Sequence, residues 1–188
     1  MNLYDYALIG LFIFIFINIY QDTYAYDAVV YVFCYGELIN LKRVKEINQP
    51  KENWPVMING LKRSLNVRGK NHLVFGIDDV NGEWCNGVLI KVSQDELRRL
   101  KKREKLYKLK TLDKDKVKFP YKKILQFNPT DKIVYFSPKS NYVLTNNELA
   151  NNAQSFKAQH YLHLSQTGAA EIGPDFYNDF MRTTTMTV

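Results

Sequence analysis

The chain of 188 residues contains only two cysteines and three histidines. Cys34 and Cys85 each lie in an apolar run typical of a strand, so we expect buried, unreactive thiols. A disulfide between them stays open, because it depends on a Cα separation under about 7 Å. His160 and His163 stand three residues apart on a predicted helix, but no third ligand accompanies them at a metal-like spacing. The sequence therefore predicts no metal site and no cofactor.

Common enzyme signatures are also absent. The chain has no G-x-S-x-G motif, no P-loop and no glycine-rich dinucleotide-binding fingerprint. Acidic residues are outnumbered, 19 against 26 basic ones, and the net charge of +7 permits contact with anions. The basic residues gather between Arg98 and Lys123, with Tyr107 and Tyr121 interleaved. We expect a solvated surface there and no nucleic-acid partner, because such tracts occur on many enzymes.

The N-terminus lacks the length of a membrane-spanning helix. Residues 7–20 are apolar apart from Asn18, but a spanning helix needs about 20 apolar residues. The length suits the core of a signal peptide, and Thr23–Ala25 resembles a cleavage site. The first six residues, however, carry Asp5 and no Lys or Arg, where a signal peptide is normally basic.

Four interpretations of this N-terminal segment stay open. It is a cleaved signal peptide, a membrane anchor that contacts lipid through residues 7–20, a buried extra strand, or the product of a wrongly assigned start codon. The first two place the protein outside the cell or at a membrane, and the others in the cytoplasm. We therefore separate residues 1–25 from a single domain formed by residues 26–188, which contains no repeat and no long linker.

Apolar runs and turn residues predict the strands. Ala28–Ile39 begins as a run of Val, Tyr and Phe and reaches Tyr35-Gly36, where glycine permits a tight turn. Trp54–Val67 predicts two short strands broken near Asn59-Gly60. The other predicted strands are Leu73–Ile77 and Gly87–Val92, joined by a turn at Asp79–Gly82, then Leu106–Leu112 and Asp131–Pro138.

Helix signals follow the strands. Ser93 and Glu96 form an S-x-x-E capping box ahead of an apolar periodicity. Many strands, one inserted helix and terminal helices predict an α+β fold with a mixed sheet closed into a small β-barrel and flanked by helices. The terminal helices are predicted from about Asn147 to Gln166, ended by Gly168, and from about Gly173, pairing Phe176 with Phe180.

One acidic residue stands out on the first helix. Leu97, Leu100 and Glu104 share one helical stripe, at positions i, i+3 and i+7. A carboxylate on an apolar stripe either has a partner or has a raised pKa, which a general acid–base needs. The alternative is a helix-end glutamate that reaches solvent or pairs with an arginine. The basic residues predicted to point elsewhere are Arg98, Arg99, Lys102, Arg103 and Lys105.

Four segments, in order, resemble the gamma-glutamylcyclotransferase-like family, which includes the AIG2-like and ChaC-like proteins. The resemblance covers most of residues 28–184. VFCYGELIN is similar to the YGSL-type motif after the first strand, and NGLKRSLNVRG to the arginine-rich strand. CNGVLIKVSQDELRRLKKREKLYKL is similar to the strand, helix and catalytic glutamate, and YLHLSQTGAAEIGPDFYNDFMRTT to the C-terminal segment.

The resemblance implies a metal-independent reaction on a small-molecule γ-glutamyl substrate. The α-amine of the γ-glutamyl group attacks its own γ-carbonyl, which closes 5-oxoproline and expels an amine or amino acid. Glu104 is then the acid–base. The turn formed by Tyr35, Gly36, Glu37 and Leu38 holds the glutamyl end through backbone N–H groups, and Tyr107 is its neighbour.

The chain departs from the family pattern at this turn. Glu37 replaces the family's serine, and Cys34 stands where a glycine is frequent. The Glu37 carboxylate either repels the substrate's α-carboxylate, attracts its α-ammonium, or pairs with Arg43, Arg63 or Arg68. The substitution leaves open a catalytically inactive member of the fold that binds a ligand or a protein. It also leaves the substrate open among glutathione, γ-glutamyl amino acids, γ-glutamylamines and an antibiotic side chain.

Overall fold

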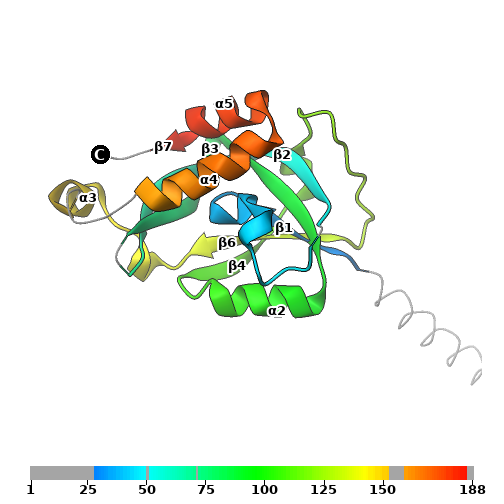
Figure 1. Cartoon of the computed structure of the whole chain (residues 1–188), viewed down its shortest axis with the longest axis horizontal. Coiled ribbons are helices and arrows are strands. Elements are labelled where there is room, and N and C mark those ends of the chain that lie inside the picture. Colours follow the sequence, from blue (N-terminus) through cyan, green and yellow to red (C-terminus); the bar gives the residue numbers. More distant parts are fainter. Residues whose placement is uncertain (1–27, 50, 71, 153–158, 186–188) are drawn as a thin grey trace, which may run out of the picture.

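A mixed β-sheet curls into a half-barrel with helices on two sides (Figure 1). The computed structural model describes residues 28–49, 51–70, 72–152 and 159–185. None of the helices in these ranges is both long and apolar enough to cross a membrane. The segment 1–25 lies outside the described residues, so its assignment stays a prediction. The described strands are β1 (Val30–Cys34), β2 (Asn53–Arg68), β3 (Leu73–Val92), β4 (Tyr107–Leu112), β5 (Val117–Lys118), β6 (Lys132–Pro138) and β7 (Thr184–Thr185).

The strand order places β1 inside the sheet. The order is β4-β6-β1-β3-β2-β5, and β7 pairs with β2. β1 runs antiparallel to β3 and parallel to β6, and all five of its residues are buried. A strand that is paired on both edges and covered on both faces has a continuous apolar sequence, as Val30–Cys34 does. The predicted α+β fold is confirmed, and its barrel is a curled half-barrel.

β2 and β3 form one long hairpin, so the prediction of four short strands in this region is wrong. We expected turns at Asn59-Gly60 and at Asp79–Gly82, but both strands continue through them. The register between β2 and β3 shifts between Asn59 and Leu61, where Gly60 has a φ of +80°. A bulge bends a strand and increases its twist without ending it. The glycines therefore help to curl the sheet instead of reversing the chain.

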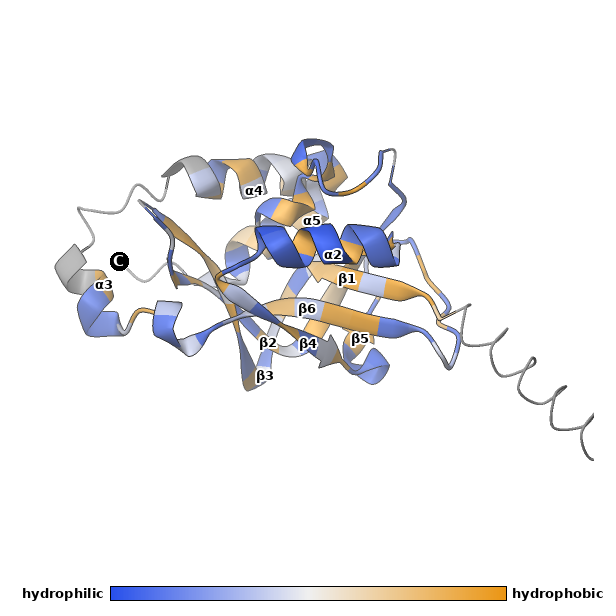
Figure 2. Ribbon diagram, turned by 90° about the horizontal axis from the view of Figure 1, so that it is seen from below, coloured by the Kyte–Doolittle hydropathy of each residue, from blue (hydrophilic) through white to orange (hydrophobic). Residues whose placement is uncertain are grey.

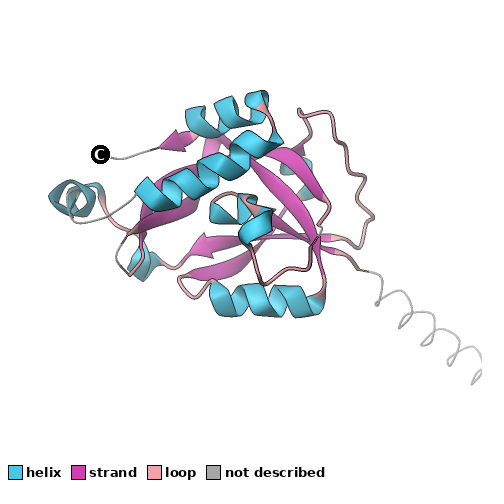
Figure 3. Cartoon of the chain, in the orientation of Figure 1, coloured by secondary structure: helices cyan, strands magenta, loops and turns pink. Residues whose placement is uncertain are grey.

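The helices cover the sheet from two sides. Figures 1 and 3 show α4 and α5 together on one side of the sheet and α2 on the other. The described helices are α2 (Gln94–Arg103), α3 (Asn146–Asn152), α4 (Gln159–Ile172) and α5 (Pro174–Arg182). Short 3-10 turns are η1 (Glu37–Ile39), η2 (Leu41–Arg43), η3 (Lys114–Lys116) and η4 (Ser140–Tyr142).

The capping box predicted at the start of α2 is confirmed. The Glu96 N–H donates to the Ser93 hydroxyl at 3.2 Å, and the Glu96 carboxylate accepts from the Ser93 N–H at 2.7 Å. Lys51 pairs with the same carboxylate at 2.8 Å. Burial by itself would raise the pKa of Glu96, but the hydrogen bonds from Lys51, Ser93 and Asn48 outweigh it and hold this pKa at about 2. An ionised, nearly buried carboxylate thus fixes where α2 begins.

The terminal helices differ from the prediction in one respect. The described parts of the predicted helix over residues 147–166 belong to α3 and α4, and Gly168 lies inside α4, which continues to Ile172. A Cβ at Gly168 would lie 2.7 Å from the backbone nitrogen of Asn40. Glycine therefore allows α4 to approach the segment after β1, and it does not end the helix. α5 begins at Pro174, as predicted.

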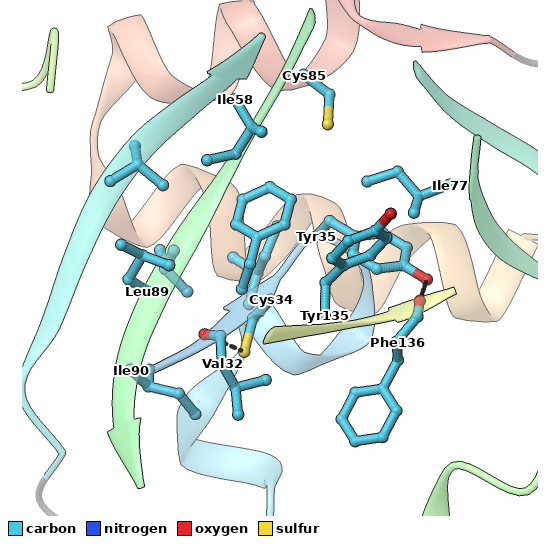
Figure 4. Packing of buried hydrophobic residues seen from close by; sticks show 14 of the residues in the cluster. Val32, Cys34, Tyr35, Ile58, Ile77, Cys85, Leu89, Ile90, Tyr135 and Phe136 are labelled. Carbon is cyan, nitrogen blue, oxygen red and sulfur yellow. Dashed lines mark hydrogen bonds between the residues drawn. The ribbon is translucent and has the colours of Figure 1, made fainter. Parts of the chain in front are cut away.

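The core lies between the sheet and these helices. Figure 2 shows apolar residues along β1 and β6, while α2 is largely hydrophilic. Cys34 and Cys85 are buried free thiols, as expected, and burial raises both of their pKa values, that of Cys85 to about 12. The Cys34 thiol lies 3.7 Å from the Val32 carbonyl (Figure 4). Phe176 and Phe180, which were predicted to pair one turn apart on the final helix, are both fully buried in α5.

Candidate active site

A pocket lies where the chain leaves β1 and meets the end of α2. Its volume is about 150 Å³, below the roughly 300–1,000 Å³ of pockets for drug-sized ligands. It therefore accommodates one end of a small molecule. The lining residues come from distant parts of the sequence: Phe33, Tyr35, Gly36, Glu37, Leu38, His72, Val74, Phe75, Arg103, Glu104, Lys105, Leu106, Tyr107, Phe136 and Tyr161. All six residues predicted for the site are among them.

The turn after β1 is held from both sides. The Tyr35 hydroxyl donates to the Phe136 carbonyl of β6 (Figure 4). The Tyr35 carbonyl accepts from Arg63, a fully buried arginine of β2, at 3.2 Å. At Gly36 a Cβ would lie 2.7 Å from the Tyr161 hydroxyl, so only glycine fits this close approach without a shift. The position of the turn is thus set by the Arg63 side chain of β2, the Phe136 carbonyl of β6 and the Tyr161 side chain of α4.

The backbone donors of this turn are partly used. The Glu37 N–H donates to the Tyr161 hydroxyl at 3.3 Å. The Gly36 carbonyl accepts from the Ile39 N–H and the Glu37 carbonyl from the Asn40 N–H, as the 3-10 turn η1 requires. We find no acceptor for the N–H groups of Gly36 and Leu38 within the part of the chain that the structure describes. Both residues line the pocket.

Glu104 lies at the C-terminal end of α2. Its N–H donates to the Leu100 carbonyl at 2.8 Å, while its backbone has already left the helical conformation. Leu97 and Leu100 are buried, so the three residues share an inward face, as the periodicity predicts. The Glu104 side chain is only 17% exposed. Burial raises its pKa to about 7, and Glu37 and Glu46 add to the rise, while Arg103 opposes it.

Arg103 reaches this site, which corrects the prediction that its side chain points elsewhere. Its Nε lies 3.2 Å from Glu104, one Nη 3.1 Å from Glu37, and the other 3.0 Å from Glu46. The expected partners of Glu37 were therefore wrong, since it pairs with neither Arg43, Arg63 nor Arg68. Arg103 is the last residue of α2 and stands three residues after Leu100 and seven after Glu96, which are both buried, so the helical spacing places it at the border of the inward face.

Three tyrosines complete the pocket wall. Tyr107 donates its hydroxyl to the Phe75 carbonyl at 2.7 Å, and the ring of Tyr161 lies 5.5 Å from that of Phe75. Burial raises the pKa values of Tyr35, Tyr107 and Tyr161, and the charge of Glu104 adds to each rise. All three phenols therefore stay protonated at neutral pH.

Several lining residues escaped the sequence reasoning. Arg103 was assigned to the outer surface, while Phe75 and His72 carried no signal at all. Glu46, which contacts Arg103 from outside the pocket, carried none either. Tyr161 had a signal, because it is the first residue of the C-terminal segment that resembles the family. Its role depends on α4 reaching the turn after β1, which no local pattern indicates.

The structure bears little on metals. Among the described residues, no group of three or more His, Cys, Asp or Glu side chains is placed to hold a metal ion. The His160 side chain lies outside the described residues, so the interpretation that His160 and His163 form no metal site is not tested.

Comparison with known proteins finds similarity in shape. No family model matches the chain, and neither does any curated protein sequence. YkqA from Bacillus subtilis superposes with a TM-score of 0.59 at 17% identity, covering 86% of this chain and 56% of YkqA. A protein named gamma-glutamyl cyclotransferase gives 0.57 at 13% identity, covering 82% and 88% of the two chains. An uncharacterized protein from Homo sapiens gives 0.55 at 15% identity, covering 84% and 89%.

These similarities define the class of the fold. The chain has the gamma-glutamylcyclotransferase-like fold, in which a mixed sheet forms a curled half-barrel with flanking helices. It spans little more than half the length of YkqA. This is the fold that the four sequence segments, taken in order, predicted.

Proposed function

We propose that the protein is a gamma-glutamylcyclotransferase-type enzyme that releases 5-oxoproline from a γ-glutamyl peptide or amine. One observation carries the proposal: Glu104, nearly buried in a pocket beside the turn after β1, has a pKa of about 7. A group that titrates near the working pH accepts and returns a proton with little cost in either direction. Perturbed carboxylates in pockets are frequently functional.

The proposed reaction is an intramolecular aminolysis. Ionised Glu104 takes a proton from the α-ammonium, and the resulting amine forms a C–N bond with the γ-carbonyl carbon. The bond from that carbon to the leaving nitrogen then breaks as Glu104 returns a proton to it. The α-nitrogen loses its second proton once the ring C–N bond has formed, and this proton converts the departing amine into an ammonium, so no external acid or base is consumed. The nucleophile is tethered to its target, which supplies proximity without a covalent enzyme intermediate.

The neighbours of Glu104 have distinct parts in this proposal. The free N–H groups of Gly36 and Leu38 are donors for the substrate α-carboxylate or the developing oxyanion. Tyr35 and Tyr107 already donate their hydroxyls to backbone carbonyls, so they offer ring surface to the substrate and no hydroxyl donor. The small pocket holds the glutamyl end and leaves the departing group outside.

A second candidate is a catalytically silent binding module on the same fold. Glu37, where the YGSL-type motif has serine, lines the pocket, and its N–H already donates to Tyr161. Against this, the Glu37 carboxylate lies 3.1 Å from Arg103, so it already has a cationic partner within the protein. The N–H groups of Gly36 and Leu38 also have no acceptor among the described residues. These two features favour the enzyme.

Release of 5-oxoproline from a panel of γ-glutamyl substrates by the full-length protein tests the proposal. Glu104→Gln should abolish release while the protein stays folded. Glu171→Gln is the matched control, because Glu171 is a half-exposed glutamate that pairs with Lys42 and is absent from the pocket. Release by the Glu104 variant would remove Glu104 from the reaction. A folded protein inactive on every substrate would favour the binding module.

A further inference from the structure

Three carboxylates share one guanidinium at the end of α2. Glu37 belongs to η1, Glu46 follows η2, and Glu104 directly follows Arg103, whose Nη2, Nη1 and Nε they respectively face at 3.0 to 3.2 Å. The Arg103 side chain is 23% exposed, so solvent screens these pairs only in part. The planar fork of arginine fixes the directions of all three partners at once.

Glu46 is the member of this cluster that does not line the pocket. Its side chain is 28% exposed and contacts Arg103, while its backbone carbonyl accepts from Arg99 at 2.8 Å. Two arginines, one turn apart on α2, therefore clamp this segment against the helix. Glu46 contacts Arg103 and also acts on Glu104 by its charge, from outside the pocket.

We propose that Arg103 is a positioning residue for Glu104, and that Glu46 holds Arg103 in this position from outside the pocket. The inference rests on the proposed function. Glu37, which replaces the serine of the YGSL-type motif, also holds Arg103 in this position. Its carboxylate thus serves the acid–base through Arg103 instead of blocking the pocket.

The charge count gives this arrangement a chemical consequence. One guanidinium faces three carboxylates, so the cluster carries two net negative charges when all are ionised and one when Glu104 is protonated. Protonation of Glu104 relieves repulsion from Glu37 and Glu46, and burial acts in the same direction. Arg103 limits the rise, which keeps Glu104 able to ionise. Other titratable groups also face Glu104. Its charge raises the pKa values of Cys34, Tyr35, Tyr107 and Tyr161. Lys105 and His72 line the same pocket.

The test measures the titration of Glu104 directly, by NMR of the full-length protein with ¹³C-labelled glutamate carboxyls. The Glu104 signal is assigned by its loss in Glu104→Gln. Glu46→Gln keeps an oxygen acceptor for Arg103 but removes the charge, so the Glu104 midpoint should fall. The midpoint should fall by about 0.5 to 1.5 pH units. This is roughly the effect of removing one negative charge from the far side of a guanidinium. The lower value applies if the dielectric constant is that of water, and the higher value if it is that of a protein surface. Arg103→Gln should raise the midpoint, and Arg103→Lys should restore part of the difference.

Glu171→Gln is again the control, because it removes a paired glutamate that contacts none of these groups. A Glu46→Gln midpoint equal to that of Glu171→Gln would overturn the proposal, as would an Arg103→Gln midpoint at or below that of the unmodified protein. The titration needs no turnover, so it separates failure of this inference from failure of the proposed function. If the protein is active, the acidic limb of its kcat/KM profile should move to lower pH in Glu46→Gln and stay in place in Glu171→Gln.

Discussion

Glu104→Gln should stabilise the fold above neutral pH. The folded-state pKa of Glu104 is about 7, against an ordinary value of 4.5. The folded protein therefore binds more protons than the unfolded chain between these values, and the contribution of Glu104 to stability falls as pH rises from about 4.5 to 7. Glutamine has the shape of the protonated acid and carries no charge to desolvate.

The size of the effect follows from the shift. The two pKa values differ by 7 minus 4.5, or 2.5 units, and each unit corresponds to about 1.36 kcal/mol, so the penalty at pH 8 is about 3 kcal/mol. Because the side chain is only 17% exposed, solvent screening reduces this figure little. The gain in the variant should be near zero at pH 4 and largest at pH 8.

Urea denaturation of both proteins at pH 4, 6 and 8, followed by tryptophan fluorescence, measures this difference. Glu171→Gln should show no comparable trend with pH. If Glu104→Gln changed the free energy of unfolding by the same amount at every pH, the reasoning would be refuted. Glu104 would then have the same pKa in the folded protein and in the unfolded chain. A stabilised but inactive variant would be the expected trade between stability and function.

Three further predictions concern the residues that hold the site. Arg63→Met should destabilise the protein by about 3 kcal/mol or more in urea denaturation, because the fully buried guanidinium donates to several buried carbonyl and side-chain oxygens that would lose their donors. Gly36→Ala should reduce 5-oxoproline release at least tenfold, because its Cβ would meet the Tyr161 hydroxyl, whereas Gly82→Ala faces open space at a φ of +82° and should lower only stability, by about 1 kcal/mol. Glu96→Gln should cost stability at pH 7 but little at pH 2: the folded-state pKa of about 2 lies below 4.5, so the contribution of this carboxylate is present above about pH 4.5 and disappears as pH falls toward 2. Equal losses at both pH values would contradict that account.

Local pattern predicted those elements whose partners are near in sequence. The capping box at Ser93 and Glu96 needs only residues three apart, and it is present. The inward face of α2 follows from the spacing of Leu97 and Leu100, and both are buried. Local pattern gave a wrong prediction at Asn59-Gly60, because an Asn-Gly dipeptide suits a bulge as well as a hairpin turn. Only the continued pairing of β2 with β3 decides between them.

The sequence by itself determined the β1 strand, the start and inner face of α2, and the presence of one carboxylate on that face. These depend on residue spacing and apolar content, which act over a few residues. The tertiary structure decided what surrounds that carboxylate. Arg103 meets Glu37 and Glu46 because the segment after β1 lies against the end of α2. Tyr161 reaches the turn from α4, where Gly168 allows a close approach to Asn40. The pKa of Glu104 is a product of burial and of charges on three separate segments, so no local pattern contains it.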